Sequence, residues 1–398
     1  MAMGIMNVAA YAFAMVAARV LGPSSYGALA SLMATLLVIT VLQLGLQATA
    51  ARRIAAEPEH VAQIEKTILG VTYRAAVALG VVLLLLAPLL NAVLRLDSLA
   101  TAALVSIVSV PFTIMGGQAG ILQGERRWGA LSILYILSGV PRLVIGTVLI
   151  AWQPSEATAL VGIGIGATFP IVAGWYFLRR TRESGVHSET HGFRHVIRES
   201  FHNSQVLLAF FALSNVDIIL ARNVLEEHDA GLYAGGLILT KAVLFLPQFI
   251  VVIAFPSMAT QSGRRRALTA SLSLIAVLGA AVTLGTALVP QLALVFVGGT
   301  DYEEIADHLW IFAILGTFLA MLQLLVYSVL ARQGQRSVYL IWIALATIVG
   351  VGLTTSTLRG LLTVVIATDA ALLAALLTIS LLVIRRPSAT PPVPVSAQ

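Results

Sequence analysis

Long apolar stretches, separated by short charged or turn-forming segments, dominate the sequence. Most of them reach the roughly 20 residues that a helix needs to cross the hydrocarbon core of a bilayer. Lipid offers the backbone no water to bond, so each stretch is predicted to be a helix. The short-period alternation that marks a membrane β-barrel is missing. The twelve stretches cover approximately residues 4–20, 26–51, 69–94, 98–122, 128–152, 157–178, 204–221, 231–257, 267–289, 305–330, 337–355 and 359–384.

The composition supports a chain whose main solvent is lipid. Of the 398 residues, 59% are apolar and only 11% are charged, whereas soluble domains carry about 25% charged residues. These values exclude a soluble enzyme, a disordered chain and a fibrous protein. The net charge of +6 does not indicate nucleic-acid binding, because cytoplasmic loops of membrane proteins collect Arg and Lys. The chain contains no cysteine, and we expect neither a cofactor nor a metal site.

The distribution of Arg and Lys predicts the orientation. Loops after even-numbered stretches, with the adjoining ends of the stretches, carry eighteen of these cations, and the opposite side carries four. This positive-inside bias predicts a multi-pass protein of the cell (inner) membrane with both termini in the cytoplasm. The remaining two cations, Arg142 and Lys241, fall inside predicted spans.

The longest break between apolar stretches divides six spans from six. We expect an N-terminal six-helix lobe over residues 1–178 and a C-terminal one over 204–386. Between them, residues 179–203 form a cytoplasmic linker, in which Phe193, Val196, Ile197 and Phe201 predict a short amphipathic helix on the membrane surface. The Pro-rich tail, residues 387–398, is expected to be disordered.

The two halves resemble each other at matching places. The segment "ARVLGPSSYGALA" from Ala18 aligns, with one gap, with "ARNVLEEHDAGLYA" from Ala221, which pairs Arg19 with Arg222 and Gly27 with Gly231. "QGER" in the first half likewise matches "QGQR" in the second. Each half has an even number of spans, six, so both halves enter the membrane in the same direction. The two halves are therefore expected to be related by a pseudo-two-fold axis along the membrane normal. Parallel repeats of this kind occur in transporters that alternate access around a central site.

These stretches resemble a known family. "ARVLGPSSYGALASL", "NVDIILARNVLEEHDAGLYAGG" and the paired Gln-Gly-x-Arg loops are similar to the polysaccharide transporter family. This is the O-antigen and lipid-linked oligosaccharide flippase branch of the multidrug/oligosaccharidyl-lipid/polysaccharide exporter (MOP) superfamily. The resemblance implies a V-shaped bundle of twelve helices. It also implies transfer of undecaprenyl-linked glycans from the cytoplasmic to the outer leaflet by alternating access, without enzymatic chemistry.

The resemblance also implies which partners to expect. They are a lipid-linked glycan as substrate, membrane lipid and, as one option, a proton or Na⁺ as coupling ion. Glycan polymerases or glycosyltransferases are candidate protein partners, and nucleic acid is not expected.

Two charged residues lie deep in the second half. A charge in the bilayer core costs at least about 2.5–3.5 kcal/mol on insertion scales, so each needs a partner or a cavity. Lys241 lies ten residues beyond Gly231, which places it about 15 Å along its helix, near the midplane. It either meets a phosphate of the lipid carrier in a central cavity or forms a structural ion pair with Asp369.

The other charged candidates lie in the half of the membrane-spanning segments that faces away from the cytoplasm. Asp217 is either a coupling carboxylate or, as the spacing favours, a partner of Arg222 or Arg19 that holds an outer gate shut. Arg142 either contacts a phosphate or sugar or bonds a backbone carbonyl. Arg19 and Arg222 each suit snorkelling to headgroups, but their symmetric placement indicates a shared gate.

Uncharged amides within the spans are further candidates. They can bond to sugar hydroxyls in a cavity, and interhelical hydrogen bonds explain each of them equally well. These residues are Asn7, Gln43, Gln47, Gln118 and Gln323.

Two alternative functions stay open. A cation-coupled multidrug exporter of the same superfamily typically places a carboxylate within its first lobe, whereas all carboxylates of residues 1–178 fall in predicted loops. A membrane-embedded glycosyltransferase usually needs a sizeable outer domain with catalytic acids, and no predicted outer loop exceeds about twenty residues.

Overall fold

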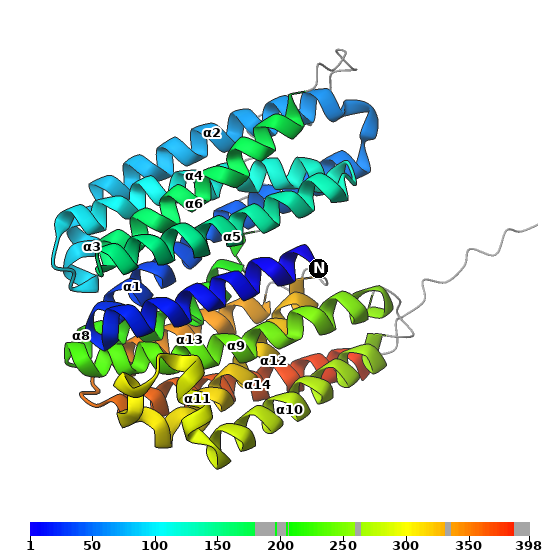
Figure 1. The fold of residues 1–398 in the computed structure, drawn as a ribbon. Coiled ribbons are helices and arrows are strands. Elements are labelled where there is room, and N and C mark those ends of the chain that lie inside the picture. Colours follow the sequence, from blue (N-terminus) through cyan, green and yellow to red (C-terminus); the bar gives the residue numbers. More distant parts are fainter. Residues whose placement is uncertain (180–195, 197–203, 206, 259–263, 331–335, 386–398) are drawn as a thin grey trace, which may run out of the picture.

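The computed structural model describes residues 1–179, 196, 204–205, 207–258, 264–330 and 336–385. Within these residues the chain forms helices and no strands (Figure 1). Nine helical stretches of the described chain are long and apolar enough to cross a membrane. The twelve predicted stretches fall on helices, and the predicted all-α integral membrane fold is confirmed.

The first six predicted spans form an N-terminal group of helices. The first two spans belong to α1 (Ala2–Ala56), which is broken at Gly22 by a left-handed backbone conformation with φ 72° and by the following Pro23. The other elements of this group are η1 (Pro58–His60), α2 (Val61–Leu85), α3 (Ala87–Leu94), α4 (Leu99–Gly124), α5 (Trp128–Trp152) and α6 (Glu156–Leu178).

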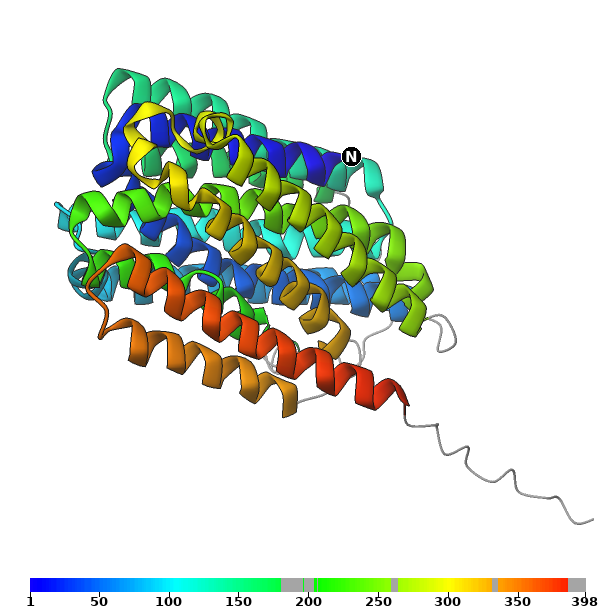
Figure 2. The ribbon, with the colours of Figure 1, turned by 90° about the horizontal axis from the view of Figure 1, so that it is seen from below.

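A C-terminal group contains the remaining helices. Its first span, Leu207–Val224, is interrupted at Ser214 and Asn215. The elements that follow are α8 (Val216–Val224), α9 (Glu227–Met258), α10 (Arg264–Leu288), α11 (Pro290–Val297), η3 (Thr300–His308), α12 (Leu309–Leu330), α13 (Arg336–Gly352) and α14 (Leu358–Arg385). Figure 2 shows α13 and α14 side by side at the margin of the molecule. The predicted amphipathic helix, apart from Val196, and the tail 387–398 lie outside the described residues.

In each half, the helix of the third predicted span is followed directly by a short separate helix. α2 breaks at Leu86, and α3 follows with Pro88 in its first turn. α10 breaks at Val289, and α11 follows with Pro290 at its start. Proline lacks the N–H that a continuous helix needs but is tolerated in a first turn. The two breaks therefore place α3 and α11 at equivalent positions of the repeat.

The two groups meet along α1 and α9 (Figure 1). The repeat mates Gly27 and Gly231 face each other there: a Cβ on Gly27 would lie 3.0 Å from the Cα of Gly231. A Cβ on Gly231 would overlap the carbonyl oxygen of Pro23. Only glycine allows this approach. A meeting of equivalent residues is what an axis between the two repeats produces.

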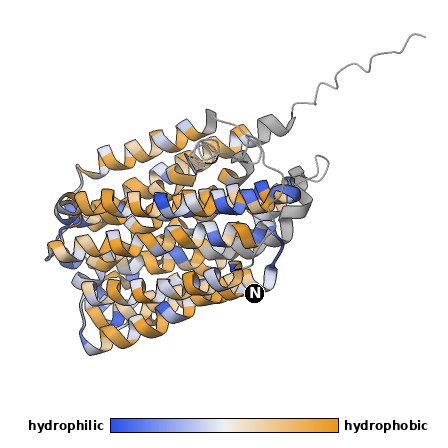
Figure 3. Cartoon of the chain, turned by 90° about the horizontal axis from the view of Figure 1, so that it is seen from above, coloured by the Kyte–Doolittle hydropathy of each residue, from blue (hydrophilic) through white to orange (hydrophobic). Residues whose placement is uncertain are grey.

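Hydrophobic residues predominate along the helices, as the hydropathy colouring in Figure 3 shows. On α2, Val77, Val81 and Leu85 repeat every four residues and point outward, with 63%, 53% and 75% of their surface exposed. An apolar exterior of this kind is stable in lipid rather than in water. We call the end of the helices that holds the N-terminus and the α4–α5 loop the inner end, and the opposite end the outer end.

Candidate functional site

A cavity of about 540 Å³ lies between the two groups of helices. Its described lining comes from α1, α4, α5 and α6 on one side and from Phe211, α8, α9 and α12 on the other. Two predicted site residues, Arg142 and Lys241, line it from opposite groups, and its described lining contains no Asp or Glu. The cavity is therefore positively charged and otherwise uncharged.

Lys241 is held by the interruption that precedes α8. Its Nζ donates a hydrogen bond of 3.2 Å to Oδ1 of Asn215. The amide nitrogen of Asn215 donates to the carbonyl oxygen of Phe211 at 2.8 Å, so the side chain closes the broken helix turn and presents its oxygen to the lysine. The described ion pairs do not join Lys241 to Asp369, the partner that the sequence left open.

Two carboxylates lie buried in the C-terminal group. Oδ1 of Asp217 accepts the backbone N–H of Ile218 at 2.9 Å, and its Oδ2 accepts the hydroxyl of Tyr233 at 3.2 Å. Asp369 is 1% exposed, and its Oδ1 has no hydrogen-bond partner in the described structure. Asp217 and Asp369 are close enough to interact electrostatically.

The predicted pairing of Asp217 with Arg222 or Arg19 is wrong. Arg222 instead donates to the carbonyl oxygens of Leu94, at 3.1 Å, and Arg95. Arg19 donates to the carbonyl oxygen of Val295 at 2.8 Å. The physical reason is that a broken helix end offers carbonyls without intrahelical partners, and cations are stabilised there.

These arginine contacts join the two groups at the outer end. Arg222 of the C-terminal group binds the end of α3, and Arg19 of the N-terminal group binds α11, the repeat equivalent of α3. Neighbouring hydrogen bonds reinforce both contacts: Arg95 to Asn223 O (2.7 Å), Asn223 to Val93 O (2.6 Å) and Tyr11 to Phe296 O (3.2 Å). We call this set of reciprocal contacts the outer gate.

Arg142 lies on α5, and its guanidinium carbon is 5.6 Å from the centre of the Phe13 ring. A cation over an aromatic face is stabilised by the ring quadrupole. Its Nε is buried without a hydrogen-bond partner in the described structure. The predicted bond to a backbone carbonyl is not among its described contacts, so the guanidinium retains donor capacity beside the cavity.

The predicted amides divide into two kinds. Asn7, Gln43, Gln47 and Gln323 line the cavity. Gln47 donates to Oε1 of Gln123 at 2.9 Å and to the hydroxyl of Tyr135 at 2.7 Å. Gln118 is 1% exposed and instead donates to the carbonyl oxygen of Ile171 at 3.2 Å. Gln118 therefore links α4 to α6 and does not line the cavity.

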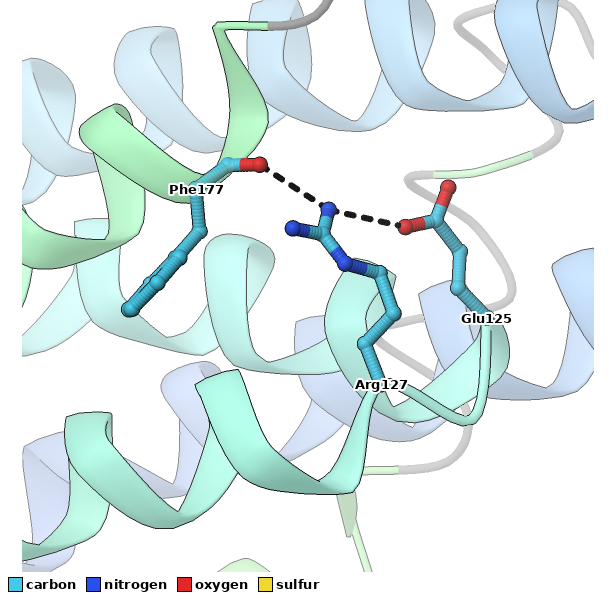
Figure 4. Close-up of polar contacts among 3 residues, drawn as sticks. All are labelled: Glu125, Arg127 and Phe177. Atoms are coloured by element: carbon cyan, nitrogen blue, oxygen red, sulfur yellow. Dashed lines mark hydrogen bonds and ion pairs between the residues drawn. The ribbon is translucent and has the colours of Figure 1, made fainter.

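The first Gln-Gly-x-Arg loop forms a clamp at the inner end. Figure 4 shows Arg127, just after the motif, donating to Glu125 at 3.3 Å and to the carbonyl oxygen of Phe177 at 2.9 Å. These bonds tie the ends of α4 and α6 to the start of α5. The second copy, from Gln333, lies largely outside the described residues.

Sequence reasoning did not assign roles to Asn215, Tyr233, Gln123 or Tyr135. A polar Asn two residues before Asp217 in an apolar span was the available signal for the first. The other three are recognised only through their partners across helices. In the described part of the chain, no group of three or more His, Asp or Glu side chains could hold a metal ion.

Many apolar helices around a charged internal cavity, joined at one end by polar contacts, define a membrane transporter. The chain belongs to the family of polysaccharide biosynthesis proteins (Polysacc_synt), whose family model matches residues 1–262. No curated protein sequence matches the chain significantly.

Solved structures share this fold over nearly the whole chain. An inward-facing multidrug resistance MATE family transporter of the MOP superfamily has a TM-score of 0.76 at 15% identity, covering 95% of this chain and 94% of its own. An outward-facing MATE transporter gives 0.61 at 16% identity, covering 96% and 95%. A MOP superfamily transporter from Pyrococcus furiosus gives 0.65 at 15% identity, covering 96% and 93%.

Fold and family together identify the chain as a multi-pass membrane transporter of the MOP superfamily, as the sequence resemblance implied. The structural neighbours are described as transporters, and the family model describes polysaccharide biosynthesis proteins.

Proposed function

We propose that this protein flips lipid-linked oligosaccharide or polysaccharide precursors, carried on an undecaprenyl diphosphate, from the cytoplasmic to the outer leaflet. The observation that carries the proposal is the pair of cations, Lys241 and Arg142, in a cavity whose described lining has no carboxylate. The family match to polysaccharide biosynthesis proteins supports a glycan as the cargo. In this proposal, residues 1–178 and 204–386 act as two lobes that rock about α1 and α9.

A cation at this depth needs a partner, and in this proposal the phosphates of the substrate provide it, in addition to Asp217, which acts electrostatically on Lys241. Lys241 is fourteen residues from the start of α9, and Arg142 is fourteen from the start of α5, so each lies about 21 Å along its helix. Two positive charges from opposite lobes suit a diphosphate, which carries several acceptor oxygens. In a site that excludes bulk water, such charge pairs are stronger than at a surface.

The proposal is tested with purified protein in proteoliposomes and a fluorescent undecaprenyl diphosphate-linked glycan. Lys241→Gln and Arg142→Gln should each lower the flipping rate about 10- to 100-fold, the range expected for a lost charge-assisted hydrogen bond. Arg359→Gln, which removes an exposed cation of the C-terminal lobe, is the matched control. Wild-type rates in both cavity variants would refute the proposal.

We propose a coupling site at Asp217, Asp369 and Tyr233. An unpaired carboxylate buried in the membrane is costly unless it takes up a proton or a cation. The interaction of the two carboxylates means that neutralising one favours ionisation of the other. A proton or Na⁺ bound there changes the charge of the C-terminal lobe beside Lys241.

We propose that the described conformation is the inward-facing state. Reciprocal contacts close the outer end, while cavity residues such as Met3 and Gln123 lie near the inner end. The higher TM-score to the inward-facing relative than to the outward-facing one is consistent with this assignment.

A multidrug exporter is the alternative favoured by the fold neighbours, which include multidrug transporters. A cationic drug, however, would be repelled by Lys241 and Arg142 in this cavity, whose described lining contains no carboxylate. Drug efflux from vesicles under a proton or Na⁺ gradient, unaffected by Lys241→Gln, would support the alternative.

The proposed topology places both termini in the cytoplasm of a cell-membrane protein. The N-terminus and the end of α14 lie at the same end of the helices (Figure 1). Glycosyltransferases that build the glycan at the inner leaflet are the proposed functional partners.

A further inference from the structure

A stripe of uncharged polar side chains runs along one wall of the cavity. Thr40, Gln43 and Gln47 all line it from α1. Their spacing of three and four residues puts them on one face of the helix. Seven residues at 1.5 Å each make the stripe about 10 Å long.

Close packing of α4 against α1 determines which face of α1 carries these polar side chains. A Cβ on Gly116 of α4 would lie 2.5 Å from the carbonyl oxygen of Gln43, and one on Gly120 would lie 2.5 Å from that of Gln47. Small residues four apart allow such backbone contact between membrane helices. This backbone contact prevents α1 from rotating about its axis at Gln43 and Gln47, the two residues whose amides line the cavity.

The amides keep hydrogen-bonding capacity on the cavity side. The side-chain nitrogen of Gln47 donates its two hydrogen bonds to Gln123 and Tyr135. Within the described part of the chain, no hydrogen bond uses the oxygen of Gln47, the nitrogen of Gln123 or the amide of Gln43. A sugar hydroxyl both donates and accepts hydrogen bonds, so it can satisfy the free donors and the free acceptors, whereas a hydrocarbon chain satisfies neither and an ammonium group only the acceptors.

The opposite wall does not repeat the stripe. Its described lining from the C-terminal group is apolar except for Lys241 and Gln323. In the register set by Gly27 and Gly231, the counterparts of Thr40, Gln43 and Gln47 lie 204 residues later and are Leu244, Pro247 and Val251. The first half of the repeat therefore carries a polar pattern that the second lacks.

We infer that the N-terminal lobe holds a glycan subsite at Gln43, Gln47, Gln123 and Tyr135, separate from the phosphate site. Tyr135 and Arg142 are seven residues apart on α5, about 10 Å along the helix, with Tyr135 nearer the inner end. A diphosphate at Arg142 and Lys241 thus places the first sugars over the amides. This inference rests on the proposed function, because it assumes a sugar attached to an anionic lipid.

The experiment compares two probes in nanodiscs: undecaprenyl diphosphate, and the same lipid bearing one N-acetylhexosamine. Dissociation constants are measured by native mass spectrometry for the wild type and for the Gln43→Leu, Gln47→Leu double variant. The variant should bind the sugar-bearing probe about tenfold more weakly, as expected for one or two lost hydrogen bonds. It should bind the bare diphosphate within about twofold of the wild type, since the phosphate site is intact.

Two amide controls separate binding from folding. Gln118→Leu removes a buried amide outside the cavity, and Gln323→Leu removes one from the opposite wall; both should preserve the wild-type ratio of the two dissociation constants. Tyr135→Phe, a smaller change, should lower sugar-bearing affinity selectively and guards against misfolding of the double variant. Thermal unfolding identifies misfolded proteins.

The outcomes separate the two proposals. If the double variant loses affinity for both probes equally, or if Gln323→Leu shows the same selective loss, the subsite assignment is overturned. If the wild type binds neither probe, or if Lys241→Gln with Arg142→Gln leaves both affinities unchanged, the proposed function itself fails.

Discussion

Lys241 donates its described hydrogen bond to a neutral partner, Asn215, while the carboxylate of Asp217 acts on it electrostatically without a described ion pair. A salt bridge would neutralise the lysine and remove its attraction for a phosphate, whereas an amide oxygen orients the ammonium and leaves the charge available. The Nζ atom of Lys241 lies 3.2 Å from Oδ1 of Asn215. The hydrogen bond to Asn215 therefore explains how the charged side chain of Lys241 is accommodated within a membrane-spanning helix.

Asn215→Ala should lower activity by misplacing Lys241. We expect a three- to tenfold weaker affinity for undecaprenyl diphosphate, about 0.7–1.4 kcal/mol, which is the net contribution of one typical hydrogen bond. The measurement is ligand binding in nanodiscs, with Thr347→Ala on the exposed face of α13 as control. An unchanged affinity would show that Lys241 is positioned without Asn215.

Asp369→Asn should separate stability from coupling. The amide is nearly isosteric and removes the cost of a buried charge, so we expect a thermal unfolding temperature equal to or above that of the wild type. Transport driven by a proton or Na⁺ gradient should fall at least tenfold, because the amide cannot take up a coupling ion. Asp307→Asn, at an exposed carboxylate of η3, is the control, and full gradient-driven transport in Asp369→Asn would exclude the proposed coupling role.

At the scale of helices, the breaks matter as much as the spans. The interruption before α8 presents Asn215. The breaks at Leu86 and Val289 begin the short helices α3 and α11, whose C-terminal carbonyls Arg222 and Arg19 bind. Membrane transporters place irregular backbone where it lines a cavity or meets a partner. The local disruptions of this fold accordingly coincide with its candidate site and gate.

The sequence predicted the spans and the two cavity cations because hydrophobic length and intramembrane charge are local properties. It could not assign the partner of Asp217, since Arg222 is five residues away in sequence but turns to the carbonyl end of α3. Nor could it separate Gln47 from Gln118, because the face that each amide presents depends on which glycine of a neighbouring helix it meets. Such contacts depend on how helices pack, and the hydrophobic pattern alone does not determine that packing.

Gly231→Ala tests the packing between α1 and α9. The added methyl group would overlap the Pro23 carbonyl oxygen, so the helices must separate. Overpacking of this kind costs about 1–3 kcal/mol, which should appear as a lower thermal unfolding temperature in detergent. Gly285→Ala, where a Cβ meets nothing within 4 Å, should be neutral. Equal behaviour of the two variants would mean that the close contact is not maintained.

At the scale of the whole molecule, alternating access requires the outer gate to be strong enough to close the cavity and weak enough to open. Hydrogen bonds between arginines and carbonyls suit this, because each contributes only a modest net free energy. Their reciprocal arrangement means that both lobes release together. In the proposed transport cycle, the two halves of the gate therefore open in one motion.

The absence of cysteine from the chain makes the gate directly measurable. A single Met33→Cys in the cavity should react with a membrane-impermeant maleimide mainly from the inner side of oriented vesicles. Adding Arg19→Gln and Arg222→Gln removes both reciprocal contacts and should raise labelling from the outer side at least threefold, because a loss of about 0.7 kcal/mol already shifts a two-state equilibrium by that factor. Arg359→Gln, also at the outer end but outside the gate, should leave the labelling pattern unchanged. If the double arginine variant labels like the parent, these contacts do not control opening, and closure of the outer end depends on the apolar packing of α1 against α9 alone.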